Sequence, residues 1–187
     1  MAQEDDNEIV GAYLSGDLAS FGVIIERHLG SVYNFVSRLS GDKDEANDIT
    51  QEIFIKVWKN LKKFDTNKNF KTWILAIARN TVIDWFRKKK SISFSQLNPP
   101  DRNEISFEET LVDVEPLPNE IFARKELTRE LETALSKIRL DWREIIFLHY
   151  TEGLTFEEIG EVVGKPPNTV KSHHLRALHQ IRNLLRI

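Results

Sequence analysis

The stretch FKTWILAIARNTVIDWFRKKK, residues 70–90, decides the fold because it combines a core helix with a strongly basic end. Apolar or small side chains recur at the spacing of a helix that buries one face, at Ile74, Ile77, Ala78, Thr81 and Trp85. The opposite face carries Arg79, Asn80 and Asp84, and the stretch ends in four consecutive cations at residues 87–90. The sequence therefore predicts a core helix whose outer face is polar and basic.

The rest of the chain is also helical in pattern, because almost every apolar residue follows a 3.6-residue period and strand signals are scarce. Helices are expected at about 5–15, 18–40, 43–61, 70–90, 119–137, 141–151, 155–163 and 167–186. Residues 91–118 contain four prolines, many acids and no sustained period. We therefore expect an all-α protein with two small helical domains, residues 1–92 and 119–187, joined by a flexible acidic linker at 93–118.

The composition of the chain excludes several classes of protein. With 187 residues and 41% hydrophobic content, the chain is long enough for globular cores. It has no cysteine, which excludes disulfides and thiolate metal sites, and no metal or cofactor is expected. The N-terminal MAQEDDNEIV is acidic and no apolar run is long enough to cross a bilayer. We therefore expect a cytoplasmic protein without membrane insertion.

Charge is unevenly distributed although the formal net charge is only -3. Residues 79–90 hold five cations against one acid, and residues 165–187 hold five cations against none. Between them, residues 91–123 hold seven acids against one cation. Two basic segments that flank an acidic bridge predict contacts with a polyanion at two separate places.

The segment TFEEIGEVVGKPPNTVKSHHLRALHQIRNLL, residues 155–185, has the pattern of a helix-turn-helix. Thr155 and Glu158 are spaced as a capping box at the start of a first helix. Gly164 suits the left-handed conformation that ends this helix, and Pro167 suits the first turn of the next one. The pattern predicts a second helix able to enter the major groove of DNA.

The period of this second helix predicts its two faces. The inward residues are expected to be Val170, His174, Ala177, Leu178, Ile181 and Leu185. The polar and basic outer face is expected to be Asn168, Thr169, Lys171, Ser172, His173 and Arg176, side chains that can bond base edges or phosphates. An ordinary helical hairpin with a solvated face remains the alternative. The histidine spacings do not form a metal set, so His174 is expected to be half-buried and structural.

Residues 44–90 strongly resemble region 2 of bacterial sigma factors of the sigma-70 family, in particular the extracytoplasmic-function group. In residues 44–61 the likeness rests on Asp48, Thr50, Gln51, Glu52, Phe54 and Trp58. In the opening stretch it rests on Phe70, Thr72, Trp73, Ile77, Ala78, Arg79, Asn80, Asp84, Trp85 and Arg87. The C-terminal EGLTFEEIG and NTVKSHHLRAL resemble region 4 of the same group, although Pro166, Asn168, His173 and His174 depart from its usual pattern.

The resemblance implies a sigma factor that binds core RNA polymerase and promoter DNA, is monomeric when free, is not an enzyme, and has an anti-sigma factor as a possible partner. It places core polymerase on Asp48, Gln51, Glu52 and Lys56. It places the minus-10 element on Lys62, Lys63, Asn67, Lys68, Asn69, Arg79, Asn80, Asp84, Arg87 and Lys88. It places the minus-35 element on Asn168, Thr169, Lys171, Ser172, His173 and Arg176. The aromatics Phe64 and Phe70 are expected either to receive an unstacked base or to be buried ends of an ordinary loop.

Two other functions would account for parts of the sequence. A stand-alone transcriptional regulator would explain the helix-turn-helix but leaves residues 44–90 unexplained. A nucleic-acid-processing enzyme would need clustered carboxylates or a nucleophile with its base, and the sequence shows neither. Binding to core polymerase is expected of a sigma factor but not of a stand-alone regulator or a nucleic-acid-processing enzyme.

Overall fold

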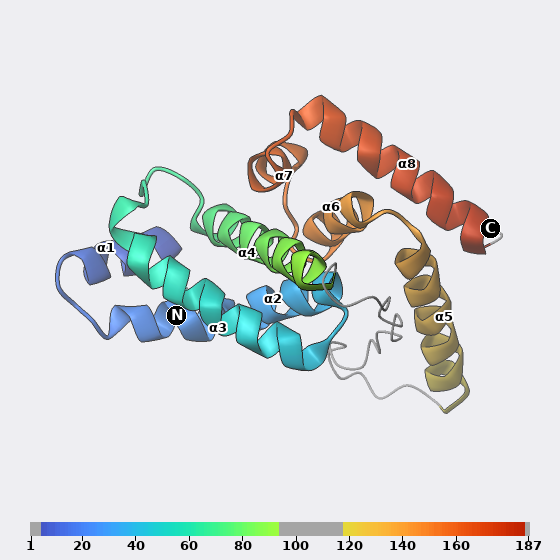
Figure 1. The fold of residues 1–187 in the computed structure, drawn as a ribbon, viewed down its shortest axis with the longest axis horizontal. Coiled ribbons are helices and arrows are strands. Elements are labelled where there is room, and N and C mark those ends of the chain that lie inside the picture. Colours follow the sequence, from blue (N-terminus) through green and yellow to red (C-terminus); the bar gives the residue numbers. More distant parts are fainter. Residues whose placement is uncertain (1–4, 94–117, 186–187) are drawn as a thin grey trace.

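The structure, a computed structural model, describes residues 5–93 and 118–185, and every regular element in these ranges is helical (Figure 1). The helices are α1 (Asp6–Leu14), α2 (Ser20–Ser40), α3 (Lys43–Asn60), α4 (Phe70–Ser93), α5 (Pro118–Lys137), α6 (Leu140–Tyr150), α7 (Phe156–Val163) and α8 (Pro167–Leu185), with a short 3-10 turn at Leu61–Lys63. All eight expected helices form, so the all-α prediction is confirmed. Nearly all of the expected linker, 93–118, lies outside the described residues.

Polar side chains cap the starts of α3 and α7. At the start of α3 the Asp42 carboxylate accepts hydrogen bonds from the backbone N–H groups of Asp44 (2.9 Å) and Glu45 (3.1 Å). The capping box of Thr155 and Glu158 at α7 is present as the sequence predicted. Gly164, at φ 66°, ends α7 in the left-handed conformation that favours glycine.

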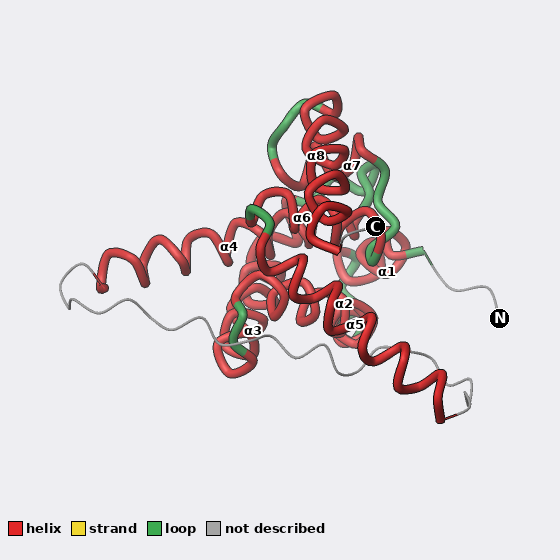
Figure 2. The backbone as a smooth tube through the Cα atoms, turned by 90° about the vertical axis from the view of Figure 1, so that its right-hand side faces the viewer, coloured by secondary structure: helices red, strands yellow, loops and turns green. Residues whose placement is uncertain are grey.

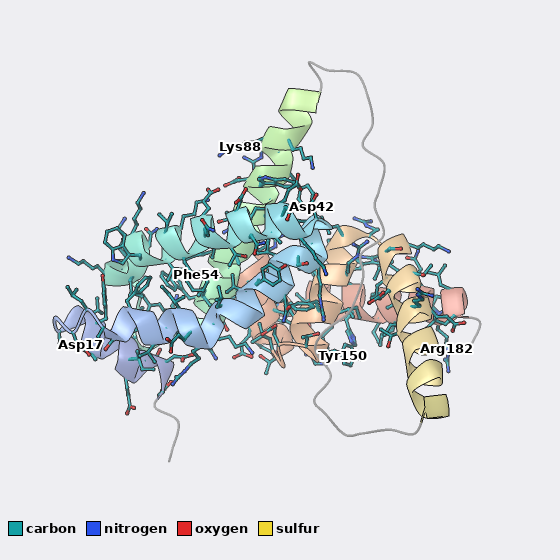
Figure 3. All side chains as sticks on the ribbon, turned by 90° about the horizontal axis from the view of Figure 1, so that it is seen from below. Asp17, Asp42, Phe54, Lys88, Tyr150 and Arg182 are labelled. Atoms are coloured by element: carbon teal, nitrogen blue, oxygen red, sulfur yellow. The ribbon has the colours of Figure 1, made fainter. Side chains whose placement is uncertain are left out.

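Helices α1–α4 form one unit around an apolar core. Phe35 of α2, Ile53 of α3 and Ile74 of α4 are fully buried in it, so each helix contributes one apolar face. The short α1 is fixed to α2 by Asp6, whose carboxylate lies 2.7 Å from the Arg27 guanidinium and 3.0 Å from Nε2 of His28. The C-terminal part of α4, which carries Lys88, extends away from this unit (Figure 3).

Helices α6–α8 form the helix-turn-helix part, and α5 leads into it. A small apolar cluster of Ala134, Ile138, Ala177 and Ile181 joins α5 to α8. The first part of α5 projects away from the other helices (Figure 2). Among the residues that the structure describes, no helix is both long and apolar enough to cross a membrane.

The main apolar core extends through both units. The buried cluster of α1–α4 continues into Ile145, Phe147 and Leu148 of α6 and into Ile159 of α7. The rings of Phe35 and Phe147 meet across the boundary at 5.6 Å, and α7 lies against α4 (Figure 1). The sequence predicted two domains but not that they would pack together in this closed arrangement.

Candidate nucleic-acid interface

Four residues of α3 are expected to contact core polymerase. Three of them, Asp48, Gln51 and Glu52, are exposed on the outer face of the helix. The fourth, Lys56, is partly covered, since its Nζ lies 2.7 Å from Glu52 and donates to the Thr81 hydroxyl at 3.2 Å. The buried side of α3 is Ile49, Ile53 and Val57, as the period predicted.

Two large apolar side chains on α3, Ile55 and Trp58, were not among the residues predicted to contact core polymerase. Ile55 and Trp58 are 51% and 53% exposed, although residues of this size and apolarity usually lie inside. They follow Gln51 at spacings of four and seven, so they belong to the same helix face. The helical period alone could have found them, because it places both outside the buried side of α3.

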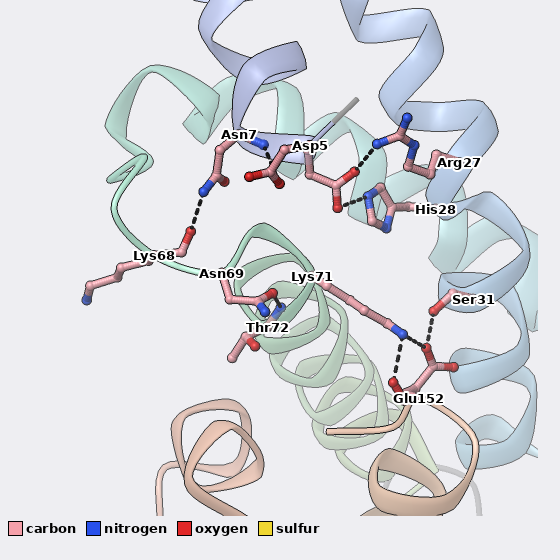
Figure 4. A network of polar contacts seen from close by, with 11 residues as sticks. Asp5, Asn7, Arg27, His28, Ser31, Lys68, Asn69, Lys71, Thr72 and Glu152 are labelled. Carbon is pink, nitrogen blue, oxygen red and sulfur yellow. Dashed lines mark hydrogen bonds and ion pairs between the residues drawn. The ribbon is translucent and has the colours of Figure 1, made fainter. Parts of the chain in front are cut away.

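The loop between α3 and α4 presents polar and basic side chains to solvent. Its five expected minus-10 contacts are all exposed, and they are Lys62, Lys63, Asn67, Lys68 and Asn69. Asn7 of α1 holds the loop by donating to the carbonyls of Thr66 (2.9 Å) and Lys68 (3.2 Å), and Figure 4 shows the bond to Lys68. Asn69 accepts from the Thr72 backbone N–H at 3.1 Å and so caps α4. The second half of the loop is therefore fixed to α1 and to the start of α4.

The aromatics of this loop are part of the core. Phe64 and Phe70 are buried and meet edge to face at 5.2 Å, which supports the expectation of an ordinary loop with buried ends and not the expectation that they receive a base. Trp73 packs on both rings, at 5.0 and 5.5 Å, and is half-buried. Trp85, expected to pack in the core, is also half-buried against it.

The outer face of α4 is partly open. Asn80 is exposed, Arg87 is 76% exposed and lies 3.3 Å from Asp84, and Lys88 is exposed near the projecting end of the helix (Figure 3). Asn80, Asp84 and Arg87 follow one another at spacings of four and three, so they line one side of α4. The side chain of the last cation, Lys90, lies outside the described residues.

Arg79 differs from its neighbours on α4 because it is covered by the C-terminal unit. Its Nε lies 2.6 Å from Oε1 of Glu144 in α6, and the contact is an ion pair without an aligned hydrogen bond. The Glu144 side chain is only 6% exposed, and burial raises its pKa to about 7 although Arg79 and Lys165 favour the charged form. The sequence predicted Arg79 on an open face, and this expectation is wrong for the closed arrangement.

A second carboxylate of the C-terminal unit, Glu152, is equally buried. Its Oε2 accepts from the Ser31 hydroxyl of α2 at 2.7 Å and lies 3.0 Å from Nζ of Lys71 in α4 (Figure 4). The Lys71 ammonium also donates to the Glu152 carbonyl at 2.8 Å. Both buried acids thus come from the helix-turn-helix unit and both cations from α4, so the contact between the units is electrostatically complementary.

The turn between α7 and α8 is tight enough to require a glycine. A Cβ on Gly160 would lie 2.7 Å from the backbone carbonyl of Lys165, closer than Cβ atoms come to such neighbours in proteins. This close approach lets the chain turn back at once into Pro167, the first residue of α8. The helix-turn-helix predicted from the sequence is therefore present.

On α8 the expected outer residues Asn168, Lys171, Ser172 and Arg176 are exposed, and Thr169 is half-buried. His173 is not on this open face. Its side chain is 16% exposed, lies 3.8 Å from Asp141, and has its pKa lowered chiefly by burial and then by Lys165. Leu178 was predicted on the inner face of α8 but is 36% exposed, because the buried face of α8 is narrower than the helical period predicted.

His174 has the structural role that was predicted. It is buried, its Nε2 lies 3.2 Å from the Tyr150 hydroxyl, and its ring packs against His149 and Phe156. Burial lowers its pKa. Within residues 5–93 and 118–185 no group of three or more potential ligands could hold a metal ion.

Comparison with known proteins matches both units. Residues 24–92 match the family Sigma-70 region 2, and residues 128–181 match Sigma-70, region 4. The chain is 32% identical over 171 residues to the ECF RNA polymerase sigma factor SigW of Bacillus subtilis, covering 91% of each chain. It is 29% identical over 163 residues to the ECF RNA polymerase sigma factor SigX of the same organism, covering 87% of this chain and 82% of that one.

Solved structures share the fold. The sigma factor RpoE in complex with the anti-sigma factor NepR from Bartonella quintana superimposes with a TM-score of 0.71 at 23% identity, covering 89% of this chain and 97% of that one. CnrH in complex with the cytosolic domain of CnrY gives a TM-score of 0.70 at 22% identity over 98% of both chains. The chain therefore belongs to the ECF group of RNA polymerase sigma factors, which are regulatory factors of promoter-specific transcription initiation and not catalysts.

Proposed function

We propose that the α1–α4 unit opens and holds the minus-10 element while α8 reads the minus-35 duplex. The observation that carries this proposal is the open side of α4, where Asn80, Asp84 and Arg87 line one face. Exposed cations of the loop before α4 suit a single-stranded backbone, and amides can bond unstacked bases. Opening then exchanges base stacking for protein contacts and requires no ATP.

Core polymerase is proposed to dock on the outer face of α3. This face combines Asp48, Gln51 and Glu52 with the exposed Ile55 and Trp58. A large aromatic beside charged and amide groups is the composition of an interface centre with a polar rim. Ile55 and Trp58 are therefore proposed as polymerase contacts in addition to the four predicted from the sequence, Asp48, Gln51, Glu52 and Lys56.

The minus-35 duplex is proposed to lie along the N-terminal half of α8. Asn168, Lys171, Ser172 and Arg176 are exposed there, and the free backbone N–H groups of the helix start suit a phosphate. Thr169 and His173 lie at the edge of this face. His173 would contact DNA only through the small exposed part of its side chain.

The division into a region 2 domain (1–92), an acidic linker (93–118) and a region 4 domain (119–187) is part of the same proposal. We also propose that the free protein is a cytoplasmic monomer and that an anti-sigma factor is among its partners. The fold shared with RpoE, which was solved in complex with the anti-sigma factor NepR, supports the last point.

Permanganate reactivity of unpaired thymines tests the opening step. Core polymerase with this protein should expose thymines of the minus-10 element on a promoter duplex, and core polymerase alone should not. Asn80→Ala should reduce that reactivity while leaving assembly with core polymerase unchanged. Reactivity that is equal with and without the protein would contradict the proposal.

A further inference from the structure

Asp141, the second residue of α6, is a carboxylate on which three basic side chains of the helix-turn-helix unit converge. The Arg139 guanidinium donates to it twice, from Nε to Oδ1 at 3.1 Å and from Nη2 to Oδ2 at 3.2 Å. Oδ2 also lies 3.6 Å from Nζ of Lys165 and 3.8 Å from Nδ1 of His173. One carboxylate thus joins the start of α6, the turn before α8 and α8 itself.

The stability of the fold does not account for this arrangement. The Arg139 side chain is 68% exposed, and those of Lys165 and Asp141 are 31% and 26% exposed. Ion pairs that water reaches so easily contribute little to stability, because the charges are screened and the side chains lose freedom. The pairs do fix orientation. A guanidinium has five N–H groups, and the two that bond to Asp141 hold its plane while the others can bond a further acceptor.

The cations held by Asp141 lie beside the outer face of α8. The Trp142 ring, next to Asp141 in the chain, lies 5.5 Å from the Arg139 guanidinium and 6.3 Å from the His173 ring. Trp142 also lines a hollow between α6 and α8 together with Arg176, one of the residues assigned to the minus-35 element. The start of α6 therefore borders the face of α8 that is proposed to read DNA.

The electrostatic surroundings of His173 give the same placement. Burial lowers its pKa most, and Lys165 lowers it further while Asp141 raises it. Arg176 and Arg139 also lower this pKa, so both cations lie close enough to act on one ring of α8. A helix in the major groove has phosphates along both edges of the groove, so cations beside its reading face meet the DNA backbone.

We propose that Asp141 is a positioning residue for promoter binding, which holds Arg139 and Lys165 where they bond phosphates of the minus-35 duplex while α8 reads the bases. The inference rests on the proposed minus-35 role of α8. Phosphate contacts fix the register and orientation of a reading helix, so Asp141 acts on DNA through the two cations and not by touching it. A carboxylate that was only a negative charge near DNA would have the opposite effect, because its removal would strengthen binding.

Salt-dependent binding of the full chain to duplex DNA tests the two cations. The probe is a fluorescent duplex enriched from a random pool by the wild-type chain. Arg139→Ala and Lys165→Ala should each flatten the plot of log Kobs against log salt by about 0.9, the value for one phosphate contact. Arg129→Ala, at an exposed position of α5, is the matched control and should leave the slope unchanged. An unchanged slope in either of the first two variants would overturn the inference.

Asp141→Asn tests the positioning role. It should weaken binding about two- to fivefold, the range for an exposed ion pair, although it removes a negative charge. Glu161→Gln, which removes a charge at an exposed position of α7, should bind at least as tightly as the wild type. In a chain that carries both Arg139→Ala and Lys165→Ala, Asp141→Asn should no longer weaken binding. Wild-type or tighter binding of Asp141→Asn alone, or an equal loss in the chain without the two cations, would overturn the inference.

Failure of this inference is distinguishable from misfolding and from failure of the proposed function. Should Asp141→Asn lose its helical circular dichroism, the slopes of Arg139→Ala and Lys165→Ala decide the matter, because a smaller folded fraction changes the apparent affinity and not the slope. If Arg176→Ala weakens binding while those two slopes stay at the wild-type value, the inference fails and the proposed role of α8 stands. If the wild-type chain enriches no duplex, or Arg176→Ala binds like the wild type, the proposed role of α8 fails and the inference with it.

Discussion

Arg79 in the proposed minus-10 helix and Glu144 in the helix-turn-helix unit lie 2.6 Å apart across the boundary between the two units. The pair covers one cation of the proposed minus-10 surface in the closed arrangement. It also makes closure dependent on pH, since burial raises the pKa of Glu144 to about 7 from an ordinary value of 4.5.

Closure should strengthen as the pH falls from about 7 to about 4.5. Glu144 has a higher pKa in the closed form than in an open form where water reaches it, so closing binds a proton in this window. Its contribution is fully present below about 4.5 and is lost as the pH rises through about 7. Energy transfer between dyes on Glu26→Cys of α2 and Asn183→Cys of α8, both exposed positions, measured from pH 5 to pH 8, checks the direction.

Glu144→Gln is the control for this pH dependence. It keeps the size of the side chain but cannot ionise, so other groups, including the facing Arg79, Lys165 and Asp141, act alone. His28 and His173, whose pKa values are lowered by burial, are present in both proteins. The difference between the two curves isolates Glu144, and identical curves would show that this carboxyl does not titrate with closure.

Asp48→Arg and Gln51→Arg should weaken assembly with core polymerase while leaving helicity intact, because both residues are exposed on α3. Trp58→Ala should do the same, at a cost of about 2 kcal/mol or more in binding if it lies at the centre of the interface. Glu26→Arg, an exposed acid on α2, is the matched control for charge. Pull-down with core polymerase measures the effect, and wild-type affinity in all three variants would mean that the docking face lies elsewhere.

Gly160→Ala should destabilise the helix-turn-helix by about 1 to 3 kcal/mol, because the added Cβ meets the Lys165 carbonyl at 2.7 Å. Gly30→Ala is the opposite case, since nothing lies within 4 Å of its Cβ position in α2. It should stabilise the protein by up to about 1 kcal/mol through helix propensity. Urea unfolding followed by circular dichroism separates the two, and equal midpoints would argue against the tight turn.

Arg176→Ala should cost about 1 to 3 kcal/mol at minus-35 duplex sites and relax the preference at one position. His174→Ala should instead lower the thermal stability of the C-terminal unit, since it removes a buried ring bonded to the Tyr150 hydroxyl. Binding-site selection on both variants compares them. A changed consensus for His174→Ala with none for Arg176→Ala would mean that the recognition face is rotated.

Local patterns were sufficient to predict the helices and their ends. The capping box at Thr155 and the left-handed Gly164 depend on residues within a few positions of one another, so their sequence signals are complete. The buried side of α3 was likewise readable from the spacing of Ile49, Ile53 and Val57. The polar faces of α3 and α8 followed largely from the same period.

What the sequence could not show depends on contacts between distant segments. The covering of Arg79 requires α6 to lie against α4, and no local pattern encodes that packing. His173 is covered for a similar reason, because Asp141 and Trp142 of α6 lie beside it. A helical period predicts the direction of a side chain, whereas its burial also depends on which other segment packs against it.

The most direct test of the account is run-off transcription with purified core RNA polymerase on a library of promoter fragments. We predict discrete transcripts only when this protein is added, with starts at a fixed distance downstream of a shared minus-10 and minus-35 pair. Asp48→Arg should reduce their amount, and Glu26→Arg should not. Transcripts that are the same with and without the protein, or none although it assembles with core polymerase, would contradict the account.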